Sequence, residues 1–296
     1  YMKTSEILRK VKKIEIKARG LSQNVFAGQY HSAFKGRGMS FAEVREYQFG
    51  DDVRDIDWTV TAKMGNPSIK VYEEERELTV MLMIDVSGSL NFGTKHQMKK
   101  DMVAEMAATL AFSAIETGDK VGVLFFSDGI EKYIAPQKGK RHILRIIREI
   151  IEFKPKSCRT NLSQALEFYS RVMRKRTTVF ILSDFFIEHE LDNVNHLEKI
   201  LSISSHRHDI IALQVYDPLA KVLPNVGLLY VEDAETGHEM VIDTSNKNIR
   251  QAHSIFWLNR EKKLLNLFNK LKIDNISVAT DENYVTKLMQ LFKQRY

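Results

Sequence analysis

The sequence predicts a three-layer α/β fold built on a doubly wound, mostly parallel β-sheet. From residue 78 onward, short apolar runs alternate with segments of helical periodicity. Such alternation favours parallel strands that are covered by helices on both faces. Residues 1–77 follow a different pattern. We therefore expect two parts, a basic helix and loop-rich extension over residues 1–77 and the α/β domain over residues 78–296.

The extension opens with a basic amphipathic helix. Residues 1–37 hold nine Lys or Arg and two Glu, a balance of 9 − 2 = +7, whereas the whole chain carries +6. We expect the helix over about 5–19 to pack on the protein's own body, and weak contact with a membrane surface stays open. Binding of nucleic acid is not expected, because no stacking aromatics interleave with the basic residues. The apolar stripe that predicts the helix consists of Ile7, Val11, Ile14, Ala18 and Leu21.

The rest of the extension, residues 26–77, predicts an irregular and polar segment. Four of its aspartates are close in sequence, but their spacing does not fit an EF-hand calcium loop. We expect them to pair with arginines, and we expect Trp58 to be a packing anchor. The aspartates are Asp51, Asp52, Asp55 and Asp57, and the arginines are Arg45, Arg54 and Arg76.

Beyond residue 78, each element is predicted by its own pattern. Strand patterns cover residues 78–84, 121–126, 130–134, 178–182, 210–216, 228–232, 239–243 and 275–279. Helical patterns cover residues 98–118, 142–153, 162–174, 190–204, 247–270 and 282–294. The turn at residues 127–129 predicts that 130–134 returns antiparallel at one edge of the sheet.

The composition favours a folded cytoplasmic protein. The single cysteine, Cys158, excludes an intrachain disulfide and CxxC zinc sites and fits a reducing compartment. No apolar run reaches the roughly 18 residues of a membrane-spanning helix, and no signal-peptide pattern is expected. Cys158 is expected to be a small buried residue, because no histidine base can be assigned to it.

The sequence Asp85-Val-Ser87-Gly-Ser89 follows a buried strand directly. Thr160 precedes a predicted helix, and Asp184 ends another strand. Because ligands bind at the carboxyl ends of parallel strands, we expect these five side chains to surround one cation. One set of carboxylate and hydroxyl oxygens suits Mg²⁺, Mn²⁺ or Ca²⁺ rather than zinc.

This order of residues resembles the von Willebrand factor A domain and its metal-ion-dependent adhesion site. That family's pattern is Asp-x-Ser-x-Ser, followed by a Thr and then an Asp. The resemblance implies a Rossmann-type core in which Ser87 and Ser89 bind metal directly. Asp85, Thr160 and Asp184 would bind it directly or through water. An acidic side chain of a partner protein would complete the coordination.

A longer set of motifs resembles the bacterial family called domain of unknown function 58. It includes residues 36–47, 50–58, 61–63 and 70–77, the pair Asp217-Pro218 and the last helix. The resemblance implies a von Willebrand A-like core and association with AAA+ ATPases of the MoxR type, in protein maturation or stress response. Known members with membrane helices differ from this chain.

The patterns favour a metal-dependent protein-interaction module over an enzyme. No Gly-x-Ser-x-Gly motif surrounds Ser87, and no histidine base for it can be assigned. The cluster at His206 and His208 is expected on an exposed loop before the strand at 210. The alternative is a metal-dependent hydrolase that uses the same Asp/Ser loop.

Overall fold

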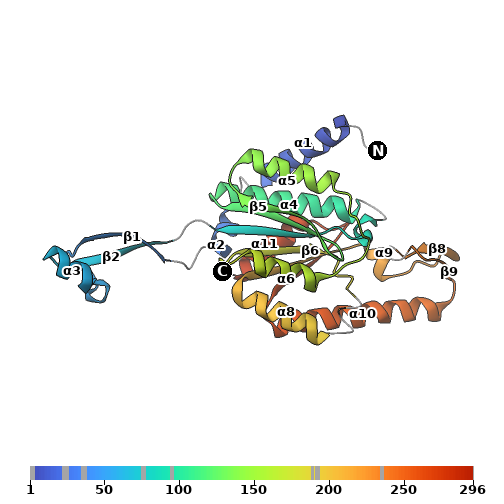
Figure 1. Cartoon of the computed structure of the whole chain (residues 1–296). Coiled ribbons are helices and arrows are strands. Elements are labelled where there is room, and N and C mark those ends of the chain that lie inside the picture. Colours follow the sequence, from blue (N-terminus) through green and yellow to red (C-terminus); the bar gives the residue numbers. More distant parts are fainter. Residues whose placement is uncertain are drawn as a thin grey trace.

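A six-stranded sheet forms the centre of the molecule, and five of its strands are parallel (Figure 1). We describe a computed structural model over residues 4–21, 27–34, 39–74, 78–93, 97–187, 190, 194–233 and 237–295. The strand order is β10-β7-β6-β3-β4-β5, and β5 runs antiparallel to β4 at one edge. The strands are β3 (Thr79–Asp85), β4 (Lys120–Phe126), β5 (Ile130–Gln137), β6 (Thr178–Ser183), β7 (Asp209–Tyr216) and β10 (Asp274–Ala279).

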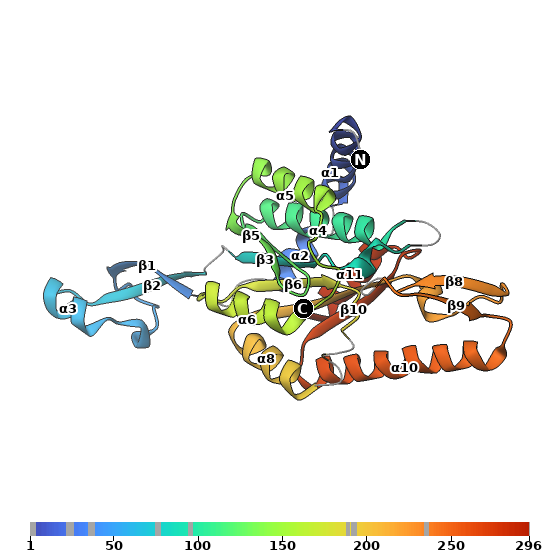
Figure 2. The same cartoon turned by 45° about the vertical axis from the view of Figure 1, so that its right-hand side comes forward.

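Helices cover both faces of this sheet, as Figures 1 and 2 show. One face carries α1 (Thr4–Leu21), α2 (Ala27–Phe34), α4 (Lys99–Glu116), α5 (Lys140–Glu152) and α11 (Tyr284–Arg295). The other face carries α6 (Leu162–Val172), α8 (Val194–Arg207) and α10 (Lys247–Lys270). The predicted doubly wound α/β fold is therefore confirmed.

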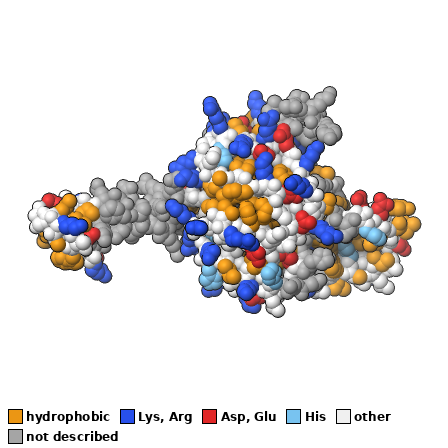
Figure 3. Space-filling model, in the orientation of Figure 1, with side chains coloured by type: hydrophobic (Ala, Val, Ile, Leu, Met, Phe, Trp, Pro, Cys, Tyr) orange, Lys and Arg blue, Asp and Glu red, His pale blue; other side chains and the backbone are white. Residues whose placement is uncertain are grey.

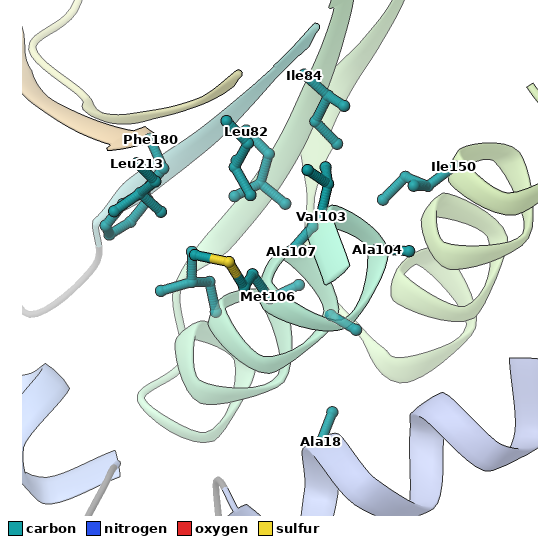
Figure 4. Packing of buried hydrophobic residues seen from close by; sticks show 14 of the residues in the cluster. Ala18, Leu82, Ile84, Val103, Ala104, Met106, Ala107, Ile150, Phe180 and Leu213 are labelled. Atoms are coloured by element: carbon teal, nitrogen blue, oxygen red, sulfur yellow. The ribbon is translucent and has the colours of Figure 1, made fainter. Parts of the chain in front are cut away.

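The period of two along each strand divides the core into two layers. On β3, Leu82 and Ile84 face the α4 side, while Met81 and Met83 face the α6 side. Helix α4 is buried almost all round between the sheet and the outer helices. Its side chains Val103, Ala107 and others meet the strand residues in Figure 4. This packing fixes the ends of β3 and α4, where the candidate site lies.

The basic helix α1 packs on the protein's own body, as its apolar stripe predicts. Ile14 and Ala18 are buried, and Val11 and Leu21 pack beside the core. Lys17 forms an ion pair with Glu105 of α4 at 2.5 Å, and Lys10 forms another with Asp101. The side chain of Ile7 lies outside the described residues.

Residues 39–74 form a regular unit, so the expectation of an irregular segment is wrong. Strands β1 (Met39–Glu46) and β2 (Ser68–Glu74) make an antiparallel ribbon that projects from the body (Figure 1). Between them lie the 3₁₀ turn η2 (Val53–Asp55) and helix α3 (Trp58–Met64). The side chains of Asp52 and Asp57 accept hydrogen bonds from backbone amides in the first turn of these two elements, a capping signal that periodicity alone does not reveal.

The tip of this ribbon exposes apolar side chains, as Figure 3 shows. Trp58 is 67% exposed, so its expected role as a packing anchor is wrong. Two of the expected ion pairs are present, Arg45 with Asp51 at 2.8 Å and Arg54 with Asp52 at 3.0 Å. The side chains of Asp55 and Arg76 lie outside the described residues.

A second projection leaves the body after β7. It consists of the short helix α9 (Pro218–Lys221) and the ribbon of β8 (Leu228–Glu232) and β9 (Glu239–Asp243), beside α10 (Figure 2). Asp217 begins α9 by accepting a hydrogen bond from the Leu219 amide, with Pro218 in the first helical turn. Both predicted strands at 228–232 and 239–243 are confirmed.

Candidate metal site at the carboxyl edge of the sheet

The candidate site lies where the order of the sheet reverses. The chain runs from β3 to β4 and β5 on one side, then crosses back to β6 on the other side of β3. Open α/β sheets bind ligands at such a switch point, outside the carboxyl ends of the strands. Asp85 is the last residue of β3, and Asp184 directly follows β6. The topology therefore brings the two aspartates to the same crevice.

Asp85 is buried and held by hydrogen bonds to both carboxylate oxygens. The Ser87 amide donates to Oδ1 at 2.8 Å, and the Ser183 hydroxyl donates to Oδ2 at 2.6 Å. Ser183 Oγ also accepts from the Phe185 amide at 2.8 Å. Strands β3 and β6 are thus joined at their ends by one hydroxyl, which fixes the orientation of the carboxylate.

Ser87 and Ser89 lie on the turn that leaves β3. Ser89 belongs to the 3₁₀ turn η3 (Gly88–Asn91), Ser87 directly precedes it, and the two hydroxyl oxygens are 3.1 Å apart and buried. Ser87 precedes η3 but makes no capping hydrogen bond through its side chain. The Gly88 amide donates to the Cys158 carbonyl at 2.9 Å, which holds the loop of residues 158–161 against this turn. The two predicted serines therefore lie together, beside the loop that carries Thr160.

Thr160 has a buried hydroxyl oxygen that lacks a hydrogen-bond partner in the described part of the chain. Its neighbour Asn161 begins α6, since its side chain accepts from the Gln164 amide at 2.9 Å. Leaving a buried hydroxyl unpaired has a free-energy cost of about 1–3 kcal/mol. An unpaired oxygen donor at this position fits a ligand that can accept its lone pair.

Asp184 lies in a turn with unusual backbone geometry. Phe185 has a φ of 51°, which is uncommon for a residue with a large side chain. The guanidinium of Arg260 donates to the Phe185 carbonyl and lies 4.6 Å from the ring of Phe186. Helix α10 therefore holds the strained turn, and with it the Asp184 backbone, in place.

The Asp184 carboxylate has a buried cation as its partner. Lys99, the first residue of α4, places Nζ 2.7 Å from Asp184 Oδ2. The Phe186 amide donates to Oδ1 at 3.1 Å, and the Ser89 hydroxyl also hydrogen-bonds to this carboxylate. Burial by itself raises the pKa of Asp184, but the Lys99 ammonium and these hydrogen bonds hold it below its ordinary value.

Asp85 has the opposite shift. Burial, followed by the nearby charge of Asp184, raises the pKa of Asp85 to about 7. Hydrogen bonds from Ser183 and Ser87 oppose this rise without cancelling it. A raised pKa means that the ionised form is less favourable here than in water, first through desolvation and then through the Asp184 charge, and nearby positive charge would offset both effects. A divalent cation would supply that charge.

The donor set suits a hard divalent cation. It consists of two carboxylates and three hydroxyls, the ligand type of Mg²⁺, Mn²⁺ and Ca²⁺. Within the described ranges, no group of three or more His, Cys, Asp or Glu could hold a metal ion. A cation site here therefore requires the serine and threonine hydroxyls as ligands. The unpaired Thr160 oxygen and the electrostatics of Asp85 are the features that fit it.

Sequence reasoning did not identify two residues of this region. Ser183 is adjacent to Asp184 in the sequence, so a hydroxyl at the end of a predicted strand could have identified it as part of the site. Lys99 has no such signal, because Lys100 beside it has the same side chain and a half-buried position. Only the packing of α4 against the sheet distinguishes them.

Two expectations about rival residues are wrong. Cys158 is exposed rather than buried. His206 and Arg207 end α8, and His208 is buried beneath the start of β7 rather than on an exposed loop. The Thr177 hydroxyl lies 2.9 Å from His208 Nδ1.

The fold and the site define a class, a doubly wound α/β protein with an acidic and hydroxyl-rich switch point. The family described as "Protein of unknown function DUF58" matches residues 43–262, and the chain belongs to this family. An uncharacterized protein of Mycobacterium tuberculosis, Rv1480, is 31% identical over 226 residues, covering 76% of this chain and 69% of the relative. YeaD of Bacillus subtilis, also uncharacterized, is 28% identical over 132 residues, 44% of this chain and 29% of the relative.

Solved structures give more distant similarities. BatB of Bacteroides thetaiotaomicron is 13% identical with a TM-score of 0.47, covering 74% of this chain and 98% of its own. An aerotolerance-related membrane protein of Bacteroides fragilis is 15% identical with a TM-score of 0.48, covering 73% and 99%. The VWA domain of SpRpn10 is 10% identical with a TM-score of 0.37, covering 71% and 93%. Within the described residues, no helix combines the length and the apolar character that crossing a membrane requires.

Proposed function

We propose that this chain is a divalent-cation-dependent protein-interaction module with a von Willebrand A-type site. Asp85, Ser87, Ser89, Thr160 and Asp184 would hold Mg²⁺, or Mn²⁺ or Ca²⁺ in its place. The bound cation would supply a positive charge that attracts an anionic side chain. The protein's own residues would hold the cation, and the partner's side chain would complete its coordination.

The observation that carries the proposal is the unpaired hydroxyl of Thr160, on a loop held against the Ser87–Ser89 turn. Thr160 Oγ1 is buried without a partner among the described residues, and its loop is fastened to the Ser87–Ser89 turn through Gly88. Asp85 precedes this turn, and its burial, followed by the nearby charge of Asp184, raises its pKa to about 7. A cation bound by oxygen donors would relieve both features at once.

The partner we propose is a protein with an exposed Asp or Glu. Following the family resemblance, we propose a MoxR-type AAA+ ATPase, or a protein that such an ATPase remodels, in protein maturation or stress response. A cytoplasmic location is part of the same proposal. A carboxylate is the expected ligand, because hard cations prefer anionic oxygen.

We propose binding rather than catalysis at this site. The Ser87 hydroxyl is paired with Ser89 and Asp85, whereas an activated serine nucleophile needs a base such as histidine within hydrogen-bonding reach. The hydrolase alternative predicts turnover of phosphoesters or peptides by the purified chain with Mg²⁺. An activity that disappears in Asp85→Asn would replace our proposal by that alternative.

The direct test is calorimetric titration of Mg²⁺ and Mn²⁺ into the chelator-treated chain and into Asp85→Asn. We expect saturable binding to the unchanged chain and a loss of about a hundredfold or more in the variant, since a ligand and its orientation are both affected.

Asp119→Asn is the matched control. Asp119 is also buried but lies before β4 at the opposite edge of the sheet, where it accepts from the Leu78 amide at 2.9 Å. Equal loss in both variants would indicate general damage to the fold. Absence of binding to the unchanged chain would overturn the proposal.

A further inference from the structure

The Lys99–Asp184 ion pair is the most buried of those in the described part of the chain. The Lys99 side chain is 7% exposed and that of Asp184 is 6% exposed. The next most buried pairs, Arg295–Asp209 and Lys221–Glu261, keep between 13% and 28% of each side chain exposed. Burying an ammonium has a large desolvation cost unless a specific charge compensates it. The burial of the Lys99 ammonium therefore needs an explanation, which a solvent-exposed lysine would not.

The ammonium lies within the proposed ligand set rather than beside it. Its nitrogen contacts Asp184 Oδ2, and the same carboxylate accepts from the Ser89 hydroxyl. Ser89 in turn lies 3.1 Å from Ser87. On its outer side, Lys99 Nζ lies 5.8 Å from the centre of the Phe92 ring, a cation–π contact. A positive group thus already reaches one of the five residues proposed to hold the divalent ion.

The charges of the site explain what this ammonium does. With both carboxylates ionised, Asp85, Asp184 and Lys99 together carry one negative charge. Without Lys99 they would carry two, in a buried region where like charges repel strongly. With a divalent cation the site would carry one positive charge, whereas without Lys99 it would be neutral. The ammonium therefore stabilises the metal-free site and leaves the loaded site attractive to an external carboxylate.

We infer that Lys99 is a tethered cation that balances the site when no divalent ion is bound and competes with that ion when it binds. This inference rests on the proposed function, because it concerns the same ligand set. It makes the metal-free protein a stable state of the molecule. It also makes divalent binding weaker and more readily reversible than the oxygen ligands alone would allow.

The test compares Lys99→Met with the unchanged chain by two measurements. Calorimetry with Mn²⁺ and Mg²⁺ gives the affinity, and thermal unfolding in chelator and in saturating Mg²⁺ gives the stability of each state. We expect Lys99→Met to bind Mn²⁺ roughly tenfold or more tightly, because a like charge has been removed. We also expect a lower Tm in chelator and a larger rise of Tm on adding Mg²⁺.

Two matched variants separate charge from packing. Lys100→Met removes the neighbouring lysine, whose ammonium donates to the Phe153 carbonyl at 2.8 Å, and should behave as the unchanged chain. Lys99→Arg keeps the charge and should not gain affinity. Lys99→Gln, which can still donate to Asp184, replaces Lys99→Met if the latter does not fold, and it should show the same gain.

The outcomes distinguish this inference from the proposed function. Binding by Lys99→Met but not by the unchanged chain would support Lys99 as the cation of the site and overturn metal dependence of the natural protein. Equal or weaker binding by Lys99→Met and Lys99→Gln than by the unchanged chain would overturn the inference and leave the proposed function standing. Absence of binding in all variants would overturn both.

Discussion

Two buried polar clusters lie at opposite edges of the same sheet, and they are made of different groups. The carboxyl-edge cluster consists of Asp85, Ser87, Ser89, Lys99 and Asp184. The amino-edge cluster is the chain Tyr169–Thr177–His208, with contacts of 2.5 Å from Tyr169 Oη to Thr177 Oγ1 and 2.9 Å from Thr177 Oγ1 to His208 Nδ1. The first cluster contains ionisable groups that lie close together, whereas the second is a neutral hydrogen-bonded chain.

Because both clusters are buried, burial of polar groups is not in itself a sign of function. Burial, together with Arg207 and Arg176, lowers the pKa of His208 to about 4, so the ring is neutral near pH 7. One ring nitrogen, Nε2, has no partner among the described residues, yet no charge is left uncompensated there. At the carboxyl edge, burial and the nearby charge of Asp184 raise the pKa of Asp85 to about 7, and the two buried carboxylates lie near one ammonium, that of Lys99, which pairs with Asp184. Charge imbalance is thus the better guide to the site.

The largest expected effect is a pair of opposite pH dependences, measured in chelator. His208 has a pKa near 4 when folded and 6.5 when unfolded, so its contribution to stability is lost as pH falls from about 6.5 to 4. We expect roughly 3 kcal/mol over that range, because one pKa unit corresponds to about 1.4 kcal/mol. Asp85 has a pKa near 7 when folded and about 3.8 when unfolded, so stability is lost as pH rises from about 4 to 7.

Denaturant unfolding of His208→Gln and Asp85→Asn between pH 4 and 8 checks both signs. The difference in unfolding free energy from the unchanged chain should slope in opposite directions for the two variants. Slopes of the same sign would contradict the assignment of one neutral and one charge-deficient cluster.

The next largest effect is expected for Thr177→Val. This substitution keeps the shape of the side chain but leaves Tyr169 Oη and His208 Nδ1 without their shared partner. A destabilisation of about 2 kcal/mol should follow, since buried polar groups that lose a partner incur a desolvation penalty. Urea unfolding measures it, and Mg²⁺ affinity should stay unchanged. A loss of Mg²⁺ affinity here would mean that the two edges are coupled.

The smallest effect on stability is expected for the same substitution at the other edge, Thr160→Val. Thr160 Oγ1 has no hydrogen bond to lose within the described residues, and its unpaired burial is unfavourable, so metal-free stability should not fall and should rise by about 1 kcal/mol. Under the proposed function, Mn²⁺ affinity should fall about tenfold. A large destabilisation in chelator would indicate that this hydroxyl already has a structural partner.

The sequence predicts the central domain more completely than the extension. The strands predicted at 121–126 and 178–182 coincide with β4 and β6 to within one residue, because their side chains are buried between the helices on the two faces of the sheet. In residues 39–74 the pattern fails, since a two-stranded ribbon that projects from the body buries few side chains and leaves Trp58 exposed. The alternation of apolar and polar residues reflects which side chains are buried, so a ribbon that buries few side chains gives a weak pattern.

The candidate site divides in a similar way. Asp85 and Asp184 are predictable from strand ends, and the structure brings both to one switch point. Lys99 was not predictable, because its burial depends on how the first turn of α4 meets β6, which is a long-range contact. Whether the five oxygen donors hold a cation stays a prediction that the titration decides.

The β1–β2 ribbon has a consequence for how this protein can change over evolutionary time. Its strands are paired from Met39 with Glu74 to Glu46 with Ser68, so the chain leaves and re-enters the body at one place. Doubling the length of such an excursion adds only about 0.6 kcal/mol of closure entropy. Insertions and deletions at the tip, around residues 47–67, can therefore accumulate without shifting the register of the central sheet. The length of the ribbon can change while the carboxyl edge of the central sheet stays constant.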